Sequence, residues 1–179
     1  LPSFHINAGV LTFFATILTG NCLIQPDRFS SSTWWKDIEK TKATVFHYLG
    51  VIIAVILKTQ KETEADLSSI RVGLGAGVEP ALHQEFEEHF HIPLIEVWGM
   101  TEMCRIIAVT EEPRLIHTRA MGRPRQNLEI RVIDEHENDV PAGAQGEMII
   151  RYSDTSPRKG SFSGYLGNEE ATERAWRGG

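Results

Sequence analysis

The residues with the clearest chemical potential form one stretch, Glu96 to Glu102, which reads Glu-Val-Trp-Gly-Met-Thr-Glu. Its strand-like apolar part breaks at Gly99 and ends in a hydroxyl at Thr101 and a carboxylate at Glu102. Mg²⁺ prefers hard oxygen ligands and keeps much of its water, so one such pair beside nucleotide phosphates is a workable site. A Thr-Glu pair also begins many helices, which is the alternative interpretation. The preceding strand, indole and glycine favour a ligand site at a strand end of an α/β sheet.

A second candidate is the glycine-rich stretch Gly73 to Val78, which follows a predicted strand. It does not match the dinucleotide-binding pattern G-x-G-x-x-G, because the third glycine would fall at Val78. Two interpretations remain for this stretch. Its backbone approaches a ligand closely, or it forms a plain turn between a strand and a helix.

Three histidines, His83, His89 and His91, lie in or beside a predicted helix over residues 80–90. Helical spacing separates His83 from His89 around the axis, so these side chains do not form a metal site. We expect them to be surface or half-buried histidines. The acidic residues of the same helix are expected on its solvated face, namely Glu85, Glu87 and Glu88.

The composition is that of a soluble globular protein, with 41% hydrophobic and 23% charged residues among 179. The net charge of −6 repels nucleic acid and anionic membranes, so neither is an expected partner. Cys22 and Cys104 lie far apart in the sequence, which gives no support to a disulfide framework or a zinc site and favours a reducing, cytoplasmic setting.

Neither a membrane span nor a signal peptide is expected from the apolar pattern. The longest apolar run, Tyr48 to Leu57, is too short to cross a bilayer and indicates a buried segment. The first five residues, Leu1 to His5, have no basic region and no small-residue cleavage site. They are interpreted as a strand entered midway.

Hydrophobic periodicity predicts alternating helices and strands. The predicted helices span residues 7–19, 34–40, 51–59, 80–90 and 169–176. The predicted strands span residues 22–24, 44–48, 70–74, 93–97, 128–134 and 147–152, with a tight turn at 75–77. Asn7, Ser31 to Thr33 and Asn168 are expected to cap helices, and Gly20 to end one. The alternation predicts an α/β fold, with a parallel, doubly wound sheet in residues 1–112 and a small β-rich subdomain in 113–179.

The stretch Trp98-Gly99-Met100-Thr101-Glu102 resembles the aromatic-Gly-x-Thr-Glu motif of the adenylate-forming superfamily. That superfamily includes acyl-CoA synthetases, nonribosomal peptide adenylation domains and firefly luciferase. Other segments resemble the family in the same order along the chain: Leu1 to His5, Gly75 to Gly77, Gly122-Arg123-Pro124, Gly146-Glu147, Gly164-Tyr165 and Glu170 to Thr172. The resemblance covers essentially the whole chain and implies the fold of the large N-terminal domain of acyl-CoA synthetases.

The resemblance also implies roles for individual residues. Trp98 would pack against adenine, Thr101 would meet phosphate, and Glu102 would help to hold Mg²⁺. The implied nucleotide- and acyl-binding residues are Gly75, Ala76, Gly77, Val97, Trp98, Gly99, Met100 and Thr101. The implied catalytic residues are Thr101, Glu102 and His5.

His5 matches the family histidine near the acyl group and the pantetheine tunnel; the alternative is a strand-end histidine without a chemical role. The reaction implied by the resemblance joins a carboxylic acid to ATP, giving acyl-adenylate and pyrophosphate, and then transfers the acyl group to coenzyme A. The implied cofactors are therefore ATP, Mg²⁺ and coenzyme A.

The sequence departs from the family pattern where the acyl pocket is expected. The usual Gly-Gly-Ala-Pro order reads Gly75-Ala76-Gly77-Val78, and the usual Val-Pro after the preceding strand reads Leu49-Gly50. The Phe4-His5 pair and residues 34–44 resemble the carnitine and crotonobetaine CoA ligases. This likeness points to a short polar acid as substrate.

Several family segments lack a counterpart here: a Ser/Thr/Gly-rich phosphate loop ending in lysine, a Thr-Gly-Asp segment, and a C-terminal domain with a catalytic lysine. We therefore expect a fragment whose partners are a small carboxylic acid and the rest of the parent chain, with the phosphate loop upstream and a lid domain downstream. The isolated chain is expected not to catalyse adenylation. Two alternatives are an adenylation domain that loads a carrier protein and a noncatalytic nucleotide- or acyl-binding module.

Overall fold

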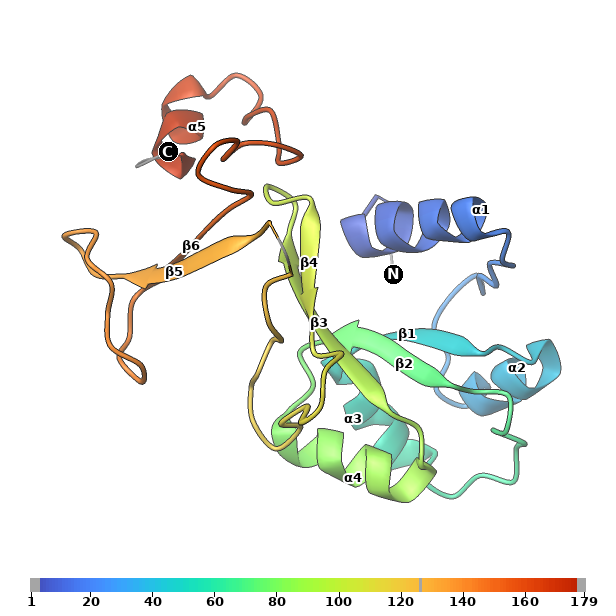
Figure 1. The fold of residues 1–179 in the computed structure, drawn as a ribbon. Helices are drawn as coiled ribbons and strands as arrows, with labels where there is room; N and C mark the ends of the chain where they lie inside the picture. The colour runs from blue at the N-terminus through green and yellow to red at the C-terminus, as the bar shows by residue number, and fades with distance from the viewer. Residues whose placement is uncertain (1–3, 126, 177–179) are drawn as a thin grey trace. The chain divides into compact units, whose positions relative to one another are not determined.

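The computed structural model describes residues 4–125 and 127–176, which form two compact units (Figure 1). The first, here called the sheet unit, comprises residues 4–98 and 108–122. The second, the C-terminal unit, comprises residues 99–107, 123–125 and 127–176. The two compact units do not test the predicted domain boundary between residues 112 and 113, which stays a prediction.

The main sheet has the strand order β1-β2-β3-β4. Its strands are β1 (Val45–Leu49), β2 (Val72–Ala76), β3 (Leu94–Met100) and β4 (Arg105–Ala108). The pairs β1–β2 and β2–β3 are parallel. Parallel neighbours need a crossover connection, which is supplied here by α3 (Gly50–Thr59) and α4 (Pro80–Phe90). Figure 1 shows α3 and α4 on one face of the sheet and the N-terminal helix over the other face. The predicted parallel, doubly covered sheet is confirmed.

The core of the sheet unit lies between the strands and three helices, α2 (Trp34–Thr41), α3 and α4. The buried apolar side chains of this core are Trp35, Ile38, Phe46, Tyr48, Ile53, Ile56, Leu57, Val78, Phe86, Ile92 and Leu94. Aromatic rings dominate its centre: the Trp35 and Phe90 ring centroids are 4.9 Å apart, and those of Phe86 and Phe90 4.8 Å. Such rings bury large apolar areas, so Trp35 on α2 packs closely against Phe86 and Phe90 on α4.

The first helix differs from its prediction. It consists of a π-helical segment, η1 (Asn7–Phe14), followed by α1 (Ala15–Thr19), and Gly20 ends it in a left-handed conformation. Asn7 does not cap the helix, because its side-chain oxygen lies 3.1 Å from Nδ1 of His47 on β1 instead. A hydrogen bond to a residue forty positions away along the chain therefore replaces the local cap.

Three smaller predictions were also wrong. Residues 22–24 are irregular and exposed, since no neighbouring strand pairs with them in the described structure. Thr33 stands at the start of α2, but its hydroxyl donates to the Asp37 carboxylate at 2.7 Å and makes no cap bond to the backbone. The predicted turn at 75–77 begins later, because Gly75 and Ala76 still belong to β2 and only Gly77 has a positive φ.

The C-terminal unit contains an antiparallel pair, β5 (Glu129–Ile133) and β6 (Glu147–Arg151), in which Val132 faces Met148. A short helix, α5 (Glu169–Ala175), follows. Asn168 caps it as predicted, since its Oδ1 accepts the N–H of Ala171 at 3.0 Å. The predicted small β-rich part and its closing helix are confirmed. The strand β4, which follows a turn over residues 101–104, was not predicted.

No helix within residues 4–125 and 127–176 is long and apolar enough to cross a membrane. Cys22 and Cys104 are exposed free thiols.

Candidate functional site

The carboxyl ends of the parallel strands carry most of the predicted binding residues of the sheet unit. The strand register pairs Leu49 with Ala76 across β1 and β2. The same register pairs Gly75 with Glu96 across β2 and β3. The glycine-rich stretch and Glu96, which lies just before the Trp98 motif, are thus neighbours at one edge of the sheet. Open α/β sheets bind ligands at this edge.

The glycines at this edge are required by close packing of the backbone. A Cβ on Gly75 would overlap the carbonyl oxygen of Tyr48, and a Cβ on Gly50 would overlap the carbonyl of Gly77. Gly77 itself has open space around it but adopts φ +79°, a conformation that favours glycine. The structure therefore supplies a packing reason for Gly50 and Gly75 and a conformational reason for Gly77, and ligand approach to this turn stays a prediction.

Glu96 links the two predicted segments. Its Oε1 accepts the hydroxyl proton of Tyr48 at 2.6 Å, and its Oε2 accepts the backbone N–H of Gly77 at 2.8 Å. Burial raises the pKa of Tyr48, and the hydrogen bond to Glu96 raises it further, so the phenol stays protonated. The sequence predicted no role for Glu96, which lies two residues before the Trp98 motif. The available signal was a carboxylate in an otherwise apolar buried strand, which requires hydrogen-bond donors.

The residues of the motif differ in exposure. Val97 is buried and Trp98 is half-buried, whereas Gly99 and Met100 are exposed at the end of β3. Thr101 is exposed in the turn before β4, and Glu102 is half-buried in the same turn. The alternative that Thr101-Glu102 begins a helix is wrong, because a four-residue turn leads directly into a strand.

Glu102 is held by a distant segment of the C-terminal unit. Its Oε1 accepts the hydroxyl proton of Tyr165 at 2.9 Å, and its backbone carbonyl accepts the N–H of Phe162 at 2.8 Å. The hydrogen bond to Glu102 raises the pKa of the Tyr165 phenol. Among the described residues, Oε2 of Glu102 has no hydrogen-bond partner.

The carboxylate of Glu102 can contribute one ligand to a metal ion but does not form a complete protein site. Within the part of the chain that the structure describes, no group of three or more His, Cys, Asp or Glu side chains could hold a metal ion. Mg²⁺ often binds through one or two carboxylates together with substrate phosphates and water. The half-buried Glu102, with one oxygen unpaired, fits that kind of shared site.

His5 is exposed at a bend, and its Nδ1 accepts the N–H of Asn7 at 3.2 Å. The predicted strand over the first five residues is wrong at Phe4 and His5, which form a turn and a bend, while residues 1–3 lie outside the described residues. A second histidine that the sequence did not suggest, His47 on β1, lies close by. It contacts Asn7 Oδ1 at 3.1 Å and Thr12 Oγ1 at 3.2 Å, and burial lowers its pKa.

Residues 1–166 match the family model described as AMP-binding enzyme. The chain belongs to the AMP-binding enzyme family. This is the adenylate-forming superfamily that the Trp98 to Glu102 motif predicted.

Similar proteins include several CoA ligases and a fatty acid transport protein. The chain is 30% identical to the sulfoacetate–CoA ligase of Cupriavidus necator, with 84% of this chain and 30% of that protein covered. It is 28% identical to the very long-chain fatty acid transport protein of Saccharomyces cerevisiae, with 97% of this chain and 29% of that protein covered. The crotonobetaine/carnitine ligases are one of several groups among these relatives.

Solved structures show the same fold. The O-succinylbenzoate coenzyme A synthetase (MenE) of Bacillus subtilis, in complex with AMP, superposes with a TM-score of 0.80 at 23% identity and covers 100% of this chain and 35% of that one. The predicted fold, that of the large N-terminal domain of acyl-CoA synthetases, is thereby confirmed. The chain spans about a third or less of the length of the relatives it matches.

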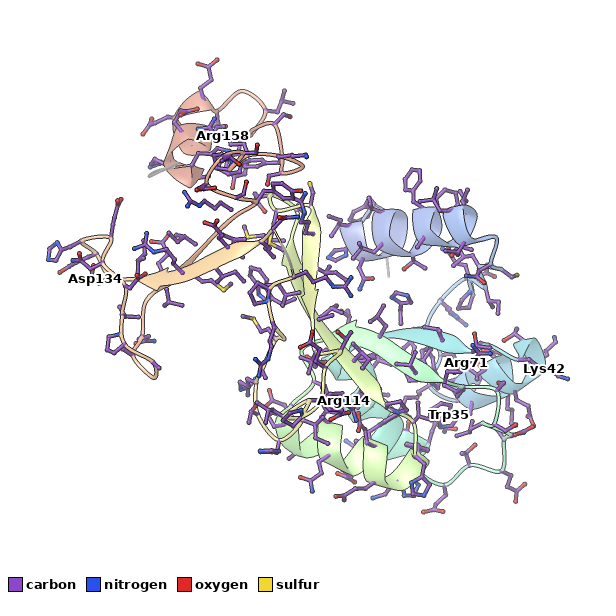
Figure 2. The ribbon with its side chains drawn as sticks, viewed as in Figure 1. Trp35, Lys42, Arg71, Arg114, Asp134 and Arg158 are labelled. Atoms are coloured by element: carbon purple, nitrogen blue, oxygen red, sulfur yellow. The ribbon has the colours of Figure 1, made fainter. Side chains whose placement is uncertain are left out.

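One polar cluster of this member of the AMP-binding enzyme family contradicts its prediction. His83 is buried, with Nε2 3.0 Å from Glu87 Oε1 and 3.1 Å from the Leu94 carbonyl oxygen. Glu87 does not lie on a solvated face, because Nη1 and Nη2 of Arg114 donate to its two oxygens at 2.7 and 2.8 Å, and the Leu94 N–H donates at 2.7 Å. Figure 2 shows Arg114 beside α4.

The charges of this cluster stabilise each other. Burial acts to raise the pKa of Glu87, but hydrogen bonds from Arg114, from the Leu94 N–H and from His83 outweigh it, so the pKa is lowered. The hydrogen bond to Glu87 raises the pKa of Arg114. The other two histidines, His89 and His91, are exposed as predicted. The cluster ties the segment after β4 to α4 and has a structural role.

Proposed function

We propose that the chain is the central part of an ATP-dependent acyl-CoA synthetase. The whole enzyme converts a carboxylic acid and ATP into acyl-AMP and pyrophosphate, and then transfers the acyl group to coenzyme A. One observation supports the proposal: in a chain of the AMP-binding family, the motif that begins at Trp98 lies at the end of a strand, and the neighbouring strand leads into the glycine turn at the edge where open α/β sheets commonly bind ligands. The similar CoA ligases support the choice of coenzyme A as acceptor.

The motif residues divide the binding of ATP between them. The half-buried indole of Trp98 offers a flat apolar face for adenine. The exposed hydroxyl of Thr101 is available to a phosphate oxygen, and Glu102 shares Mg²⁺ with the phosphates. Bound Mg²⁺ would offset negative charge while the substrate carboxylate attacks the α-phosphorus.

The remaining predicted residues are proposed to line the ligand with their backbone atoms and apolar side chains. Gly75, Ala76 and Gly77 border the adenine and acyl groups, together with Val97, Gly99 and Met100. Because Glu96 holds the N–H of Gly77, the turn is fixed before a ligand arrives. His5 is proposed to lie near the acyl group and the pantetheine arm. Its exposed ring accepts from Asn7 through Nδ1, so Nε2 is the nitrogen available to a ligand.

The complete activity belongs to a longer protein, since the chain spans 29% and 30% of two relatives. We propose that the rest of that protein supplies the phosphate-binding loop and the lid domain. The carboxylic acid substrate binds at the altered Gly75 to Val78 and Leu49-Gly50 positions. The 179-residue chain alone is proposed to be inactive.

ATP–pyrophosphate exchange by the full-length protein tests this proposal. A panel of carboxylic acids that includes short polar acids such as carnitine is assayed, and at least one is expected to support exchange and then form a thioester with free coenzyme A. The 179-residue chain is expected to give no exchange. A full-length protein that exchanges pyrophosphate with none of the acids would contradict the ligase assignment, and transfer only to a carrier protein would contradict the acceptor.

A further inference from the structure

The carboxylate and the backbone of Glu102 are both held by one segment, residues 162–165. The hydroxyl of Tyr165 donates to Oε1 of Glu102 at 2.9 Å, and the N–H of Phe162 donates to its carbonyl oxygen at 2.8 Å. All three residues belong to the C-terminal unit. A segment sixty residues further along the chain thus fixes the turn that carries the proposed metal ligand.

The backbone of Tyr165 is itself tied to α5. Its N–H donates to Oγ1 of Thr172 at 2.9 Å, and that hydroxyl donates to the carbonyl of Asn168 at 2.9 Å. Gly164 lies at φ +145°, and a Cβ there would come within 3.0 Å of the Thr172 methyl group. Glycine at this position therefore lets Thr172 approach Tyr165 closely.

The ring of Tyr165 is also restricted. Its centroid lies 4.9 Å from that of Phe162 in an edge-to-face arrangement, and Phe162 stacks on Trp176 at 5.9 Å. Edge-to-face packing favours one ring orientation. The hydroxyl is therefore aimed at Glu102 by packing as well as by the hydrogen bond.

From this chain of contacts we infer that Tyr165 is a positioning residue for the metal ligand Glu102. It occupies Oε1 and thereby leaves Oε2, which has no partner among the described residues, for Mg²⁺. A carboxylate that is already oriented loses less conformational freedom when the ion binds, and hydrogen bonds to ligating carboxylates commonly tune metal affinity. The inference rests on the proposed role of Glu102 and extends it to a residue with no proposed contact to substrate.

The variant Tyr165→Phe removes the hydroxyl and keeps the ring. In the full-length protein, the Mg²⁺ concentration for half-maximal pyrophosphate exchange is expected to rise by about tenfold, the size of one hydrogen bond to a charged group. The KM for the carboxylic acid is expected to stay unchanged. Tyr152→Phe is the matched control, because Tyr152 lies in the same unit and contacts Arg105 and Lys159 through its ring face. Equal Mg²⁺ dependence in the two variants would overturn the inference.

A double-mutant cycle tests whether Tyr165 acts through Glu102. In the background of Glu102→Gln, the further change Tyr165→Phe is expected to have no effect on Mg²⁺ dependence, since residues that share one interaction are not additive. Additive effects of the two changes would show that Tyr165 acts elsewhere, and the inference would then be wrong.

A binding measurement separates this inference from the proposed reaction. Mn²⁺ replaces Mg²⁺ as a paramagnetic probe, and its binding with ATP to the full-length protein is followed by electron paramagnetic resonance without any carboxylic acid. Tyr165→Phe is expected to weaken this binding by about tenfold and Tyr152→Phe to leave it unchanged. If the tyrosine effect appears while no acid supports exchange, the inference holds and the ligase proposal falls. If exchange occurs but the variant binds Mn²⁺ like wild type, the ligase proposal holds and the inference falls.

Discussion

Glu96 and Tyr48 form a hydrogen bond across an intervening strand. Tyr48 on β1 pairs with Gly75 on β2, and Gly75 pairs with Glu96 on β3, so the three residues form one row across the sheet. Because Gly75 has no side chain, the Tyr48 hydroxyl reaches over β2 and donates to Glu96 at 2.6 Å. The same carboxylate holds the N–H of Gly77. The Tyr48–Glu96 pair thus holds the glycine-rich stretch in place at the proposed ligand edge.

Replacing Gly75 by alanine is expected to destabilise the protein. The new Cβ would overlap the Tyr48 carbonyl and lie 2.6 Å from its ring, and such overpacking costs about 1–3 kcal/mol. The free energy of unfolding, measured by urea titration, gives the effect. Gly167→Ala is the control for losing a glycine, because a Cβ at Gly167 would meet open space. Its expected loss is about 1 kcal/mol, which comes from placing alanine at a φ of +67°. A smaller loss for Gly75→Ala than for Gly167→Ala would contradict the packing argument.

The pH dependence of stability should reveal the buried phenol of Tyr48. Burial and the Glu96 hydrogen bond raise its pKa above the ordinary value of 10.0, so the unfolded chain releases this proton first as the pH rises. The folded state binds more protons than the unfolded state in that range, and stability therefore falls above about pH 10.

Unfolding free energies of wild type and Tyr48→Phe, measured from pH 8 upward, check this expectation. The variant is expected to lose about 1 kcal/mol at neutral pH and to show a shallower decline at high pH, because its ring has no proton to release. Tyr152→Phe is expected to keep the steep decline. An unchanged slope in Tyr48→Phe would show that other groups cause the alkaline loss.

Sequence patterns correctly predicted the elements that are determined by residues close together in the sequence. The helix over Pro80–Phe90 and the Asn168 cap depend on residues within one or two turns, and both were predicted correctly. Contacts between distant residues leave no such periodic signal. Tyr165 lies 63 positions from Glu102, and neither residue type alone indicates that they meet.

The errors have the same physical origin. Asn7 was predicted as a helix cap, but its partner is His47, and Glu87 was assigned to a solvated face although Arg114 binds it. In both cases a polar side chain found a distant partner that a local pattern does not contain. For the site, the motif predicted which residues belong together in the family. It did not predict the side chains that hold the candidate site residues, such as Tyr165 for Glu102 and Glu96 for Gly77.

Acid should weaken the cluster around Glu87. Its pKa is below the ordinary value of 4.5, so the ionised carboxylate stabilises the folded state above that pH, and this stability is lost as the pH falls through the folded pKa. Glu87→Gln removes one of the two carboxylates that pair with the half-buried Arg114 and leaves Glu112, so it is expected to cost about 2 kcal/mol at pH 7.

Urea unfolding at several pH values between 3 and 7 measures both effects. Glu87→Gln should show a flatter pH profile than wild type as well as lower stability at pH 7. Glu88→Gln is the matched control on the same helix, because Glu88 is exposed and bonds only Gln84 among the described residues. A similar loss in both variants would contradict the role assigned to the Arg114 pair.

Trp98 and Glu102 should affect different steps of the proposed reaction. Trp98→Ala removes the apolar face for adenine, so the KM for ATP is expected to rise by about tenfold, as loss of one aromatic stacking partner would cause. Glu102→Gln keeps the shape of the side chain but weakens its hold on Mg²⁺. Because that charge matters most as the carboxylate attacks phosphorus, kcat for pyrophosphate exchange is expected to fall by about a hundredfold. Steady-state exchange kinetics of the full-length variants at saturating Mg²⁺ measure both constants, and equal effects of the two changes on KM and kcat would refute this division of roles.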